Sequence, residues 1–245
     1  MFRILVSNTR GIVLHQLKYA ETSVVAKVYT ELYGLQSYLI NNVYSKKAKI
    51  KPNILQPLTL LDMEVYHKEK GGLQRLKYAT AINPASKLQT DINKMSLSIF
   101  LAEVLYRSIQ EEERNPKLFE FLLAVIELLD KTEDKISNFH LVFMVQLSGH
   151  LGFIPSMQPS AKHCFFNKRD GIFETIKPNH RDWMDQKSTT IFNELLSRSF
   201  SDNMELKITS DQRFNMIEHL IAYYKLHLDK MPEIKSHKVL QAVMN

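Results

Sequence analysis

The sequence contains a single cysteine, Cys164, so the chain cannot form an internal disulfide bond. Disulfides accumulate in oxidising compartments, and a chain that cannot form one fits the reducing cytoplasm. No run approaches about 18 uncharged apolar residues, the length that a membrane-spanning helix needs. The first residues are not apolar enough for a signal peptide. From these absences we expect a cytoplasmic protein that is not inserted into a membrane.

Sequence motifs of common enzymes are also missing. There is no G-x-x-x-x-G-K-[ST] or G-x-G-x-x-G phosphate-binding loop, no H-E-x-x-H zinc motif and no G-x-S-x-G nucleophile motif. The nine histidines are scattered, and His140 and His150 lie in or near apolar segments, where we expect a structural role. The spacing of His163, Cys164 and His180 is not that of a known zinc site. The sequence therefore favours a protein that is not an enzyme and has no cofactor.

Positive charge is present but unevenly distributed. The chain has 245 residues, a net charge of +6 and 44% apolar residues, which is enough for one large or two modest folded domains. Residues 1–80 contain 12 Lys and Arg against 5 Asp and Glu, whereas residues 81–245 contain 20 against 21. This asymmetry predicts a basic module joined to a neutral one, and a polyanionic partner for the basic module.

The densest positive charge lies between two segments of alternating apolar and polar residues, 34–43 and 58–66. This basic loop contains Tyr44, Lys46, Lys47, Lys49 and Lys51. Alternation is typical of strands, and two prolines between the segments make the middle a loop. A solvated turn without a ligand is one interpretation. The other is a phosphate-binding loop on a small β-domain, because sites that follow a nucleic-acid backbone combine lysines on a fixed scaffold with nearby aromatic rings.

Periodicity divides the chain into a β part and a helical part. We expect strands at residues 9–19, 23–32, 34–43, 58–66 and 73–80, with turns at Gly34 and at residues 70–72. Five short strands in about 80 residues predict a small closed barrel. More cations lie on these strands and are candidates for the same surface as the basic loop: Arg3, Arg10, Lys18, Lys27, Arg75 and Lys77. The strand register, which the sequence does not fix, decides which of them face outward.

Helical spacing begins after Pro84. We expect helices near residues 95–109, 118–129, 139–151, 189–200, 211–228 and 236–244. Residues 152–182 contain prolines and glycines and are expected to be irregular, and Asp211 is expected to be a helix N-cap. Trp183, the only tryptophan, is expected to pack in a core or between domains. The predicted domains are therefore residues 1–82 and 83–245.

The order of several short motifs resembles that of the RecO family of bacterial recombination mediators. The matching positions are Thr9, Gly11, Val13 and Leu14, then Tyr19, Glu21 and Ser23, then Thr30, Gly34 and Leu35. ILQPLTLLDMEVY at 54–66 resembles the segment after the family's basic loop, and LSGHLGFIP at 147–155 resembles an element of its helical domain. The resemblance covers both expected domains.

This resemblance implies an α+β protein with an N-terminal five-stranded OB-fold barrel followed by an all-α helical domain. It implies binding to single- and double-stranded DNA, annealing of complementary strands, and help in loading recombinase onto strands coated by single-strand-binding protein. The implied partners are RecR and the acidic C-terminal tail of single-strand-binding protein, and the implied location is the bacterial nucleoid. Such a protein is a mediator and not an enzyme.

One departure from the family concerns metal. Many members carry two C-x-x-C pairs that hold zinc in the irregular segment, where this chain has only Cys164. We therefore expect no zinc, and we expect Phe165, Phe166, Ile172 and Phe173 to replace it with apolar packing.

We also expect the helical domain to bind an acidic, apolar-ended peptide in a groove between its helices, where an aromatic anchor is paired with a local cation. The candidate residues are Arg213, Tyr224 and Lys225.

Two other functions remain open from the sequence. A metal-dependent enzyme that processes nucleic acid would need clustered carboxylates, and Asp62 and Glu64 alternate on one strand face. A protein-interaction scaffold could use the basic barrel to contact acidic proteins without binding DNA. Activity that requires Mg²⁺ would favour the enzyme, whereas tight binding to an acidic peptide without DNA binding would favour the scaffold.

Overall fold

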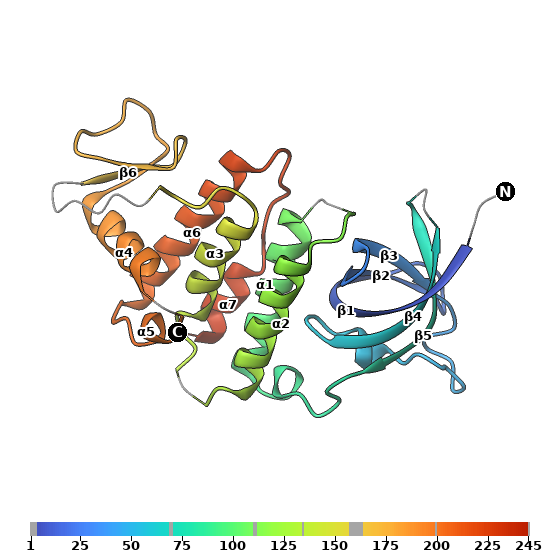
Figure 1. Ribbon diagram of the computed structural model, residues 1–245. Helices are drawn as coiled ribbons and strands as arrows, with labels where there is room; N and C mark the ends of the chain where they lie inside the picture. Colours follow the sequence, from blue (N-terminus) through green and yellow to red (C-terminus); the bar gives the residue numbers. More distant parts are fainter. Residues whose placement is uncertain are drawn as a thin grey trace. The chain divides into compact units, whose positions relative to one another are not determined.

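The structure is a computed structural model that describes residues 4–68, 71–109, 112–133, 135–156, 164–198 and 200–244 (Figure 1). The chain divides into two compact units, Met1–Lys131 and Thr132–Asn245. The first unit contains a β-barrel and two long helices, and the second contains the remaining helices and a small sheet. The predicted domain boundary at residue 82 lies close to the point where strands give way to helices, between residues 81 and 92. The two compact units divide after residue 131, because the first two helices belong to the unit of the barrel.

Five strands form a closed barrel in the order β1-β2-β3-β5-β4. They are β1 (Ile4–Lys18), β2 (Val24–Thr30), β3 (Gly34–Ile40), β4 (Leu60–Lys68) and β5 (Leu73–Ala81). All neighbours are antiparallel except β3 and β5, which are parallel over three residue pairs. A five-stranded barrel of this kind is an OB-fold, so the fold class predicted from the sequence is confirmed.

Strand β1 is longer than the sequence predicted because it pairs with two neighbours. Residues 4–12 pair with β4, and residues 11–18 pair with β2. Gly11 lies where the two pairings overlap, and a Cβ atom there would approach Met63 Sδ to 2.5 Å and Val28 Cγ1 to 2.6 Å. Only glycine permits this close approach at the point where one strand passes from one neighbour to the other.

The barrel core is made from alternate residues of all five strands. Its buried members include Val13, Val24, Ala26, Val28, Tyr38, Ile40, Leu61, Met63, Val65 and Ala79. Gly34 has a φ of +61° and makes the turn from β2 to β3, as expected. Inward alternation leaves the intervening residues on the outer surface of the barrel, where the functional candidates lie.

Two helices, α1 (Ile92–Ser108) and α2 (Pro116–Lys131), pack on the barrel within the first unit. On α1, the ring of Tyr106 stacks on His15 of β1, with 4.8 Å between the ring centroids. On α2, the ring of Phe119 lies 6.3 Å from that of Tyr29 on β2. Two short 3₁₀ helices, η1 (Pro52–Leu55) and η2 (Lys87–Gln89), lie in the connections.

The second unit consists of five helices and a small antiparallel sheet among its described residues. The helices are α3 (Phe139–His150), α4 (Gln186–Ser197), α5 (Phe200–Met204), α6 (Ser210–His227) and α7 (His237–Met244). The sheet has the order β7-β6-β8, with β6 (Phe165–Asn167), β7 (Ile172–Glu174) and β8 (Trp183–Met184). None of the described helices is both long and apolar enough to cross a membrane.

Two expectations for the second unit were wrong. Residues 152–182 were expected to be irregular, but they contain β6 and β7. The sequence did not predict these strands because three residues are too few for alternation to be recognised. The N-cap of α6 is Thr209 and not Asp211. Thr209 Oγ1 accepts a hydrogen bond from the Gln212 backbone, and the Gln212 side chain accepts one from the Thr209 backbone, which makes a capping box.

Candidate nucleic-acid interface

The basic loop between β3 and η1 is fixed at both ends by buried apolar side chains. Val43 is 1% exposed and Ile50 is 7% exposed, and both belong to the barrel core. The Val43 N–H donates a hydrogen bond to the Thr22 carbonyl in the turn between β1 and β2, at 2.8 Å. Asn42 has a φ of +59°, a conformation that asparagine tolerates better than most residues. The lysines are therefore held on a fixed frame.

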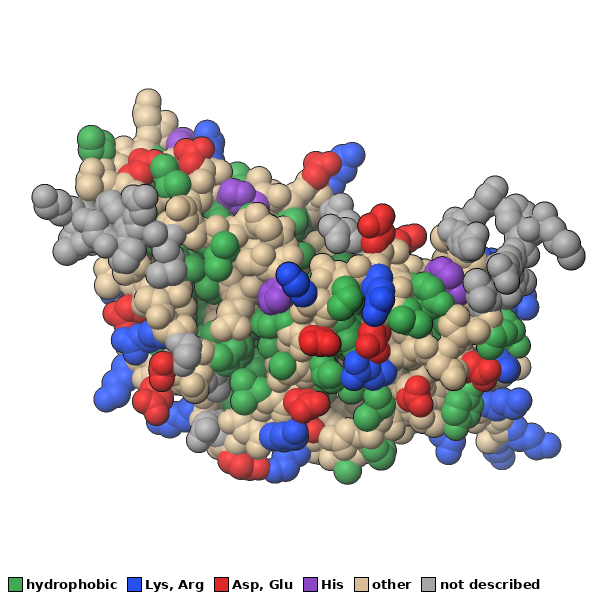
Figure 2. All heavy atoms as spheres, viewed as in Figure 1, with side chains coloured by type: hydrophobic (Ala, Val, Ile, Leu, Met, Phe, Trp, Pro, Cys, Tyr) green, Lys and Arg blue, Asp and Glu red, His purple; other side chains and the backbone are tan. Residues whose placement is uncertain are grey.

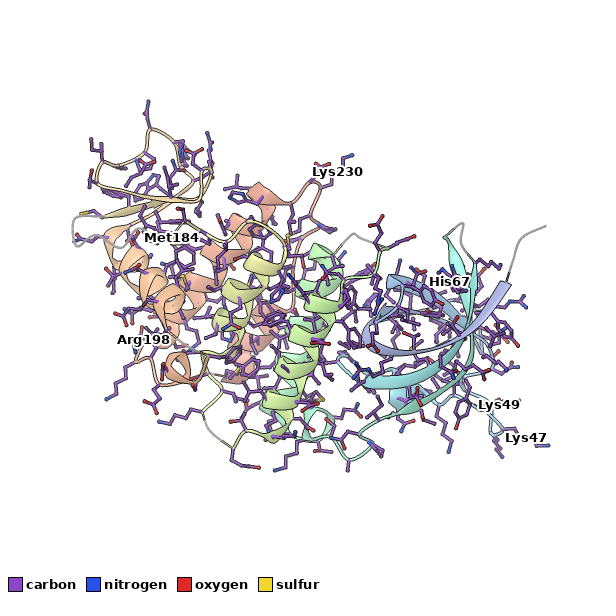
Figure 3. The ribbon with its side chains drawn as sticks, in the orientation of Figure 1. Lys47, Lys49, His67, Met184, Arg198 and Lys230 are labelled. Carbon is purple, nitrogen blue, oxygen red and sulfur yellow. The ribbon has the colours of Figure 1, made fainter. Side chains whose placement is uncertain are left out.

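All four lysines of the loop, Lys46, Lys47, Lys49 and Lys51, are exposed. None takes part in the ion pairs found among the described residues. Lys47 and Lys49 point away from the barrel in Figure 3, and Figure 2 shows Lys and Arg side chains projecting into solvent there. The Tyr44 ring in the same loop is 54% exposed. The arrangement presents positive charge and an aromatic face together to solvent.

The register places two further predicted cations on the outer surfaces of β2 and β5. These are the two neighbours of β3, the strand that leads into the basic loop. Lys27 of β2 pairs with Ser37 of β3. Arg75 of β5 pairs with Leu39 of β3, next to the start of the basic loop. Arg75 is exposed and Lys27 is half-buried. Arg75 therefore lies beside the start of the basic loop, whereas Lys27 lies opposite His15 of β1, whose ring stacks on Tyr106 of α1.

Two other predicted cations are already paired with carboxylates. Lys77 Nζ lies 2.6 Å from Glu64 Oε1, and this hydrogen bond raises the pKa of Lys77. Arg10 forms two hydrogen bonds with Glu31, of 2.8 and 2.9 Å, which raise the pKa of Arg10 and lower that of Glu31. The Arg10 guanidinium also lies 5.3 Å from the centroid of the Phe119 ring on α2. Arg10 therefore joins barrel to helix, away from the basic loop.

Among the described residues of the barrel, carboxylates do not gather as a metal-dependent enzyme would require. Glu64 is occupied by Lys77, and Asp62 pairs in register with Arg10 of β1. Over the described parts of the chain, no group of three or more His, Cys, Asp or Glu side chains could hold a metal ion. Cys164 and His180 are described, but His163 lies outside the described residues.

Aromatic packing surrounds the segment where zinc was expected to be lost. Phe166 is completely buried, and its ring lies 5.0 Å from Phe173, 4.7 Å from Phe192 and 5.5 Å from Tyr223 between centroids. Phe165 packs instead against the edge of Trp183, at 5.4 Å. Ile172, also expected in this core, is 41% exposed. The sheet is thus attached to α4 and α6 by aromatic contacts.

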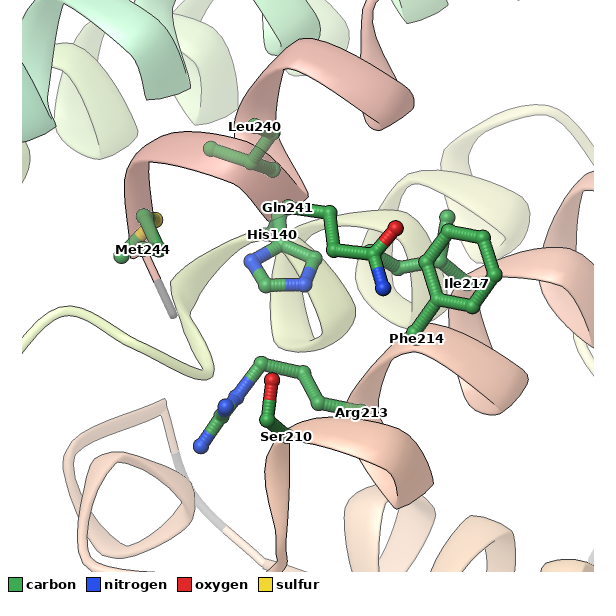
Figure 4. A pocket seen from close by; sticks show the side chains of 8 residues that line it. All are labelled: His140, Ser210, Arg213, Phe214, Ile217, Leu240, Gln241 and Met244. Carbon is green, nitrogen blue, oxygen red and sulfur yellow. The ribbon is translucent and has the colours of Figure 1, made fainter.

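Of the three candidates for the peptide site, Arg213 lines a small pocket between α3, α6 and α7. Figure 4 shows its lining: His140, Ser210, Arg213, Phe214, Ile217, Leu240, Gln241 and Met244. Arg213 lies in its wall, where its Nε donates a hydrogen bond to Asn138 Oδ1 at 3.1 Å. Burial lowers the pKa of Arg213, and burial together with the charge of Arg213 lowers the pKa of His140 to about 3.

The other two candidates for the peptide site do not line this pocket. Tyr224 is completely buried, and its hydroxyl donates a 2.6 Å hydrogen bond to the Met144 carbonyl. Tyr224 therefore supports the packing of α6 on α3. Lys225 is exposed on α6 but lies outside the pocket lining. Sequence analysis did not identify His140, Leu240 or Met244 as pocket residues, because they lie on two helices, α3 and α7, that come together only in the fold.

Comparisons with known proteins agree along nearly the whole chain. Residues 3–85 match the family described as "Recombination protein O N terminal", and residues 89–237 match "Recombination protein O C terminal". The chain is 35% identical over 239 residues to the DNA repair protein RecO of Flavobacterium psychrophilum, covering 97% of this chain and 98% of that protein. It is 32% identical over 241 residues to the DNA repair protein RecO of Phocaeicola vulgatus, covering 98% of this chain and 100% of that protein.

Proposed function

The chain belongs to the RecO family of DNA repair proteins, and from this premise we propose that it is a DNA-binding recombination mediator and not an enzyme. It binds single- and double-stranded DNA, anneals complementary strands and helps to load recombinase onto strands coated by single-strand-binding protein. RecR and the acidic tail of single-strand-binding protein are its proposed partners. The metal-dependent enzyme finds no support, because the only carboxylates singled out for it lie opposite or paired with cations.

The observation that supports DNA binding most directly is the basic loop. Its lysines are exposed, and no ion pair among the described residues neutralises them, while Val43 and Ile50 fix the loop to the barrel. A flexible tail would lose more entropy than this fixed loop does when its charges contact phosphates. Phosphate contacts position a nucleic acid without reading its sequence, so the loop suits a protein that must act on any sequence.

The test replaces Lys46, Lys47, Lys49 and Lys51 together by alanine. Each phosphate contact releases about 0.7 of a counterion from a single strand and about 0.9 from duplex. The slope of log affinity against log salt should therefore become shallower by roughly 3 units, for all sequences alike. Folding should change little, since substitutions of exposed residues usually lie within about 0.5 kcal/mol. Fluorescence anisotropy at several salt concentrations measures the slope.

A matched control removes the same charge elsewhere. Lys135, Lys187, Lys207 and Lys238 are exposed in the second unit, and their fourfold alanine variant has the same net charge as the loop variant. The control should keep the parent salt slope. Equal slopes for the loop variant and the parent would contradict the role of the loop, and equal losses in both variants would mean that only total charge matters.

The tail peptide of single-strand-binding protein is proposed to enter the pocket of the second unit, because Arg213 and apolar side chains occur there together. The free volume is about 20 Å³, which fits about one water molecule, so the pocket must widen to admit the peptide. Calorimetric titration of the full chain with the tail peptide should show saturable binding that Arg213→Gln weakens. Binding that Arg213→Gln leaves unchanged would place the peptide elsewhere.

A further inference from the structure

A cavity of about 210 Å³ lies within the first unit, between the barrel, the connection after β5 and α2. Leu58, Leu88 and Ile126 are buried in its lining, whereas Ile82, which is 47% exposed, lies where the cavity opens to solvent. The volume equals that of about seven water molecules in the liquid, whereas pockets for cofactors and drug-sized ligands usually exceed about 300 Å³. The cavity therefore suits one or two side chains of another molecule.

Leu58 lines this cavity in a backbone conformation that few side chains adopt. Its φ of +60° lies in the left-handed region, which is unfavourable for leucine because the Cβ atom comes too close to the following carbonyl oxygen. Two hydrogen bonds hold the chain there: the Leu58 N–H donates to the Val13 carbonyl at 2.8 Å, and the Val13 N–H donates to the Thr59 carbonyl at 3.0 Å. Strained residues that their surroundings fix in this way cluster at ligand-binding sites. The strain and the cavity thus point to the same place.

Two polar side chains of the lining can make further hydrogen bonds. Gln89 Nε2 donates a 2.7 Å hydrogen bond to Thr59 Oγ1, and Thr59 is only 5% exposed. Among the described residues, none accepts the Thr59 hydroxyl hydrogen and none donates to Gln89 Oε1. Polar groups that are shielded from water cost free energy until a partner satisfies them. A donor and an acceptor side by side match a peptide amide, whose carbonyl accepts and whose N–H donates.

One wall of the cavity is fixed by its own hydrogen bonds. The Asp130 carboxylate on α2 accepts three of them: from Asn83 Nδ2 at 2.7 Å, from Ser86 Oγ at 2.9 Å and from the Lys87 N–H at 2.7 Å. These bonds tie the connection between β5 and η2 to α2. A preformed site saves the free energy of ordering its own side chains when a ligand binds.

The charges at the cavity favour a cation as its ligand. Two carboxylates, Glu127 and Asp130, and one cation, Lys131, line it, which leaves an excess of one negative charge. Lys131 Nζ lies 3.0 Å from Glu127 Oε2, and Asp130 takes part in none of the ion pairs found among the described residues. Lys94 Nζ donates to the Asp130 backbone carbonyl at 2.8 Å, but Lys94 does not line the cavity. A ligand in the cavity therefore meets mainly carboxylates.

The side chains of the lining favour a peptide over a nucleic acid. Its described part has five aliphatic side chains and no aromatic ring. Single-stranded nucleic acids bind by stacking their bases on aromatic rings and by placing their phosphates against cations. The cavity has no such stacking surface, and its excess of carboxylates disfavours phosphates.

We infer that this cavity is a docking site for a short segment of a partner protein, in which an aliphatic side chain precedes a basic one. The aliphatic side chain fills the cavity, and the amide that follows it bonds to Thr59 and Gln89. The basic side chain faces Glu127 and Asp130. This segment is opposite in charge to the acidic tail proposed for the pocket of the second unit. The inference is also independent of DNA binding, which was argued from the basic loop.

The first experiment titrates the unmodified full chain with capped tetrapeptides and follows the methyl NMR signals of Leu88 and Ile126. The lysine peptide is glycine-leucine-lysine-glycine. In the glutamate peptide, glutamate replaces the lysine, and in the glycine peptide, glycine replaces the leucine. The lysine peptide should shift both signals saturably. It should bind roughly tenfold more tightly than the glycine peptide, which has no side chain to bury, and about twofold to fivefold more tightly than the glutamate peptide.

Two results of this titration would overturn the inference. One is the absence of a saturable shift with the lysine peptide, and the other is equal binding of all three peptides. Deoxythymidine is the competing probe, because a nucleobase also carries a donor beside an acceptor. A shift of the same signals by deoxythymidine and by none of the peptides would assign the cavity to a base instead.

The second experiment blocks the cavity and then changes its charge. Ile82→Trp places a larger side chain at the opening and should abolish the methyl shifts. Leu128→Trp, at a position of α2 that is 43% exposed and outside the lining, is the matched control and should leave binding unchanged. Glu127→Gln should weaken binding of the lysine peptide about twofold to fivefold and bring the glutamate peptide closer to it. Glu120→Gln makes the same charge change at an exposed position of the same helix outside the lining, and should change neither affinity.

These outcomes separate the inference from the proposed function. A folded Ile82→Trp variant that binds the lysine peptide as well as Leu128→Trp does would overturn the inference, and it would leave DNA binding untouched. The fourfold alanine variant of the basic loop should bind the lysine peptide within about twofold of the parent, because the loop lysines do not line the cavity and distant exposed charges are screened by salt. If Ile82→Trp does not fold, as judged by circular dichroism, the comparison of the three peptides on the unmodified chain decides alone.

Discussion

Acid should destabilise the second unit through His140. The size of the effect follows from how far burial lowers the pKa of this side chain. The side chain is 1% exposed, and burial, followed by the nearby charge of Arg213, lowers its pKa to about 3. In the unfolded chain the pKa returns to about 6.5. The unfolded chain therefore binds one proton more than the folded chain between these two values, so the free energy of unfolding falls as the pH falls through this range.

The size of the effect follows from the difference between the two pKa values. Between pH 7.5 and pH 5, protonation of this one histidine in the unfolded chain should lower the free energy of unfolding by about 2 kcal/mol. Each pH unit below 6.5 contributes about 1.4 kcal/mol. In urea, with a slope of about 2 kcal/mol per molar, the midpoint should move down by roughly 1 M. His219, whose pKa is lowered to about 4 mainly by burial, acts in the same direction.

The assay is urea unfolding followed by the fluorescence of Trp183, the only tryptophan, which lies in the same unit as His140. His140→Gln keeps a polar side chain but cannot titrate, so the variant should lose about 2 kcal/mol less than the parent between pH 7.5 and pH 5. Between pH 7.5 and 8.5 the two proteins should show the same pH dependence, which serves as the internal control. A variant that loses as much stability in acid as the parent would refute the assignment to His140.

Three further predictions concern packing and metal. Tyr38→Phe should leave stability unchanged or raise it by up to about 1 kcal/mol in thermal melts, because the buried Tyr38 hydroxyl has no hydrogen-bond partner among the described residues. A loss of more than about 1 kcal/mol would mean that the hydroxyl does have a hydrogen-bond partner. Phe166→Ala should cost about 3–5 kcal/mol of stability in the unit that contains Trp183, whereas Ile172→Ala, at an exposed position of the same hairpin, should stay within about 0.5 kcal/mol. Chelator treatment should leave the melting temperature unchanged and elemental analysis should find no stoichiometric zinc, while one tightly held zinc per chain would contradict this.

Local signals were enough to predict the barrel. Alternation predicted all five strands, and Gly34 marked the turn at which its positive φ is found. The position of the basic loop followed from the same pattern. Alternation could not give the register, because a shift of one residue moves every side chain to the opposite face. The position of Arg75 beside Leu39 therefore appears only in the structure.

Residues that depend on distant partners were the hardest to interpret. Arg10 was grouped with the DNA-binding cations, but Glu31, 21 positions later in the sequence, holds it in place. Tyr224 was expected at a peptide groove because its helix is amphipathic, but its hydroxyl bonds to Met144, 80 positions away. In both cases the structure shows a tertiary contact that the sequence could not predict, an ion pair for Arg10 and a buried hydrogen bond for Tyr224.

The parallel pairing of β3 with β5 has a consequence for the motions of the barrel. Only Ser37, Tyr38 and Leu39 pair across it, whereas β1 and β4 pair over nine positions. Amide protons along this short seam should therefore exchange with deuterium sooner than those between β1 and β4, because fewer hydrogen bonds must break together. The Leu39–Arg75 pair lies directly on this seam, near the start of the basic loop. If DNA binds at the basic loop as proposed, its binding should slow the exchange of these amides.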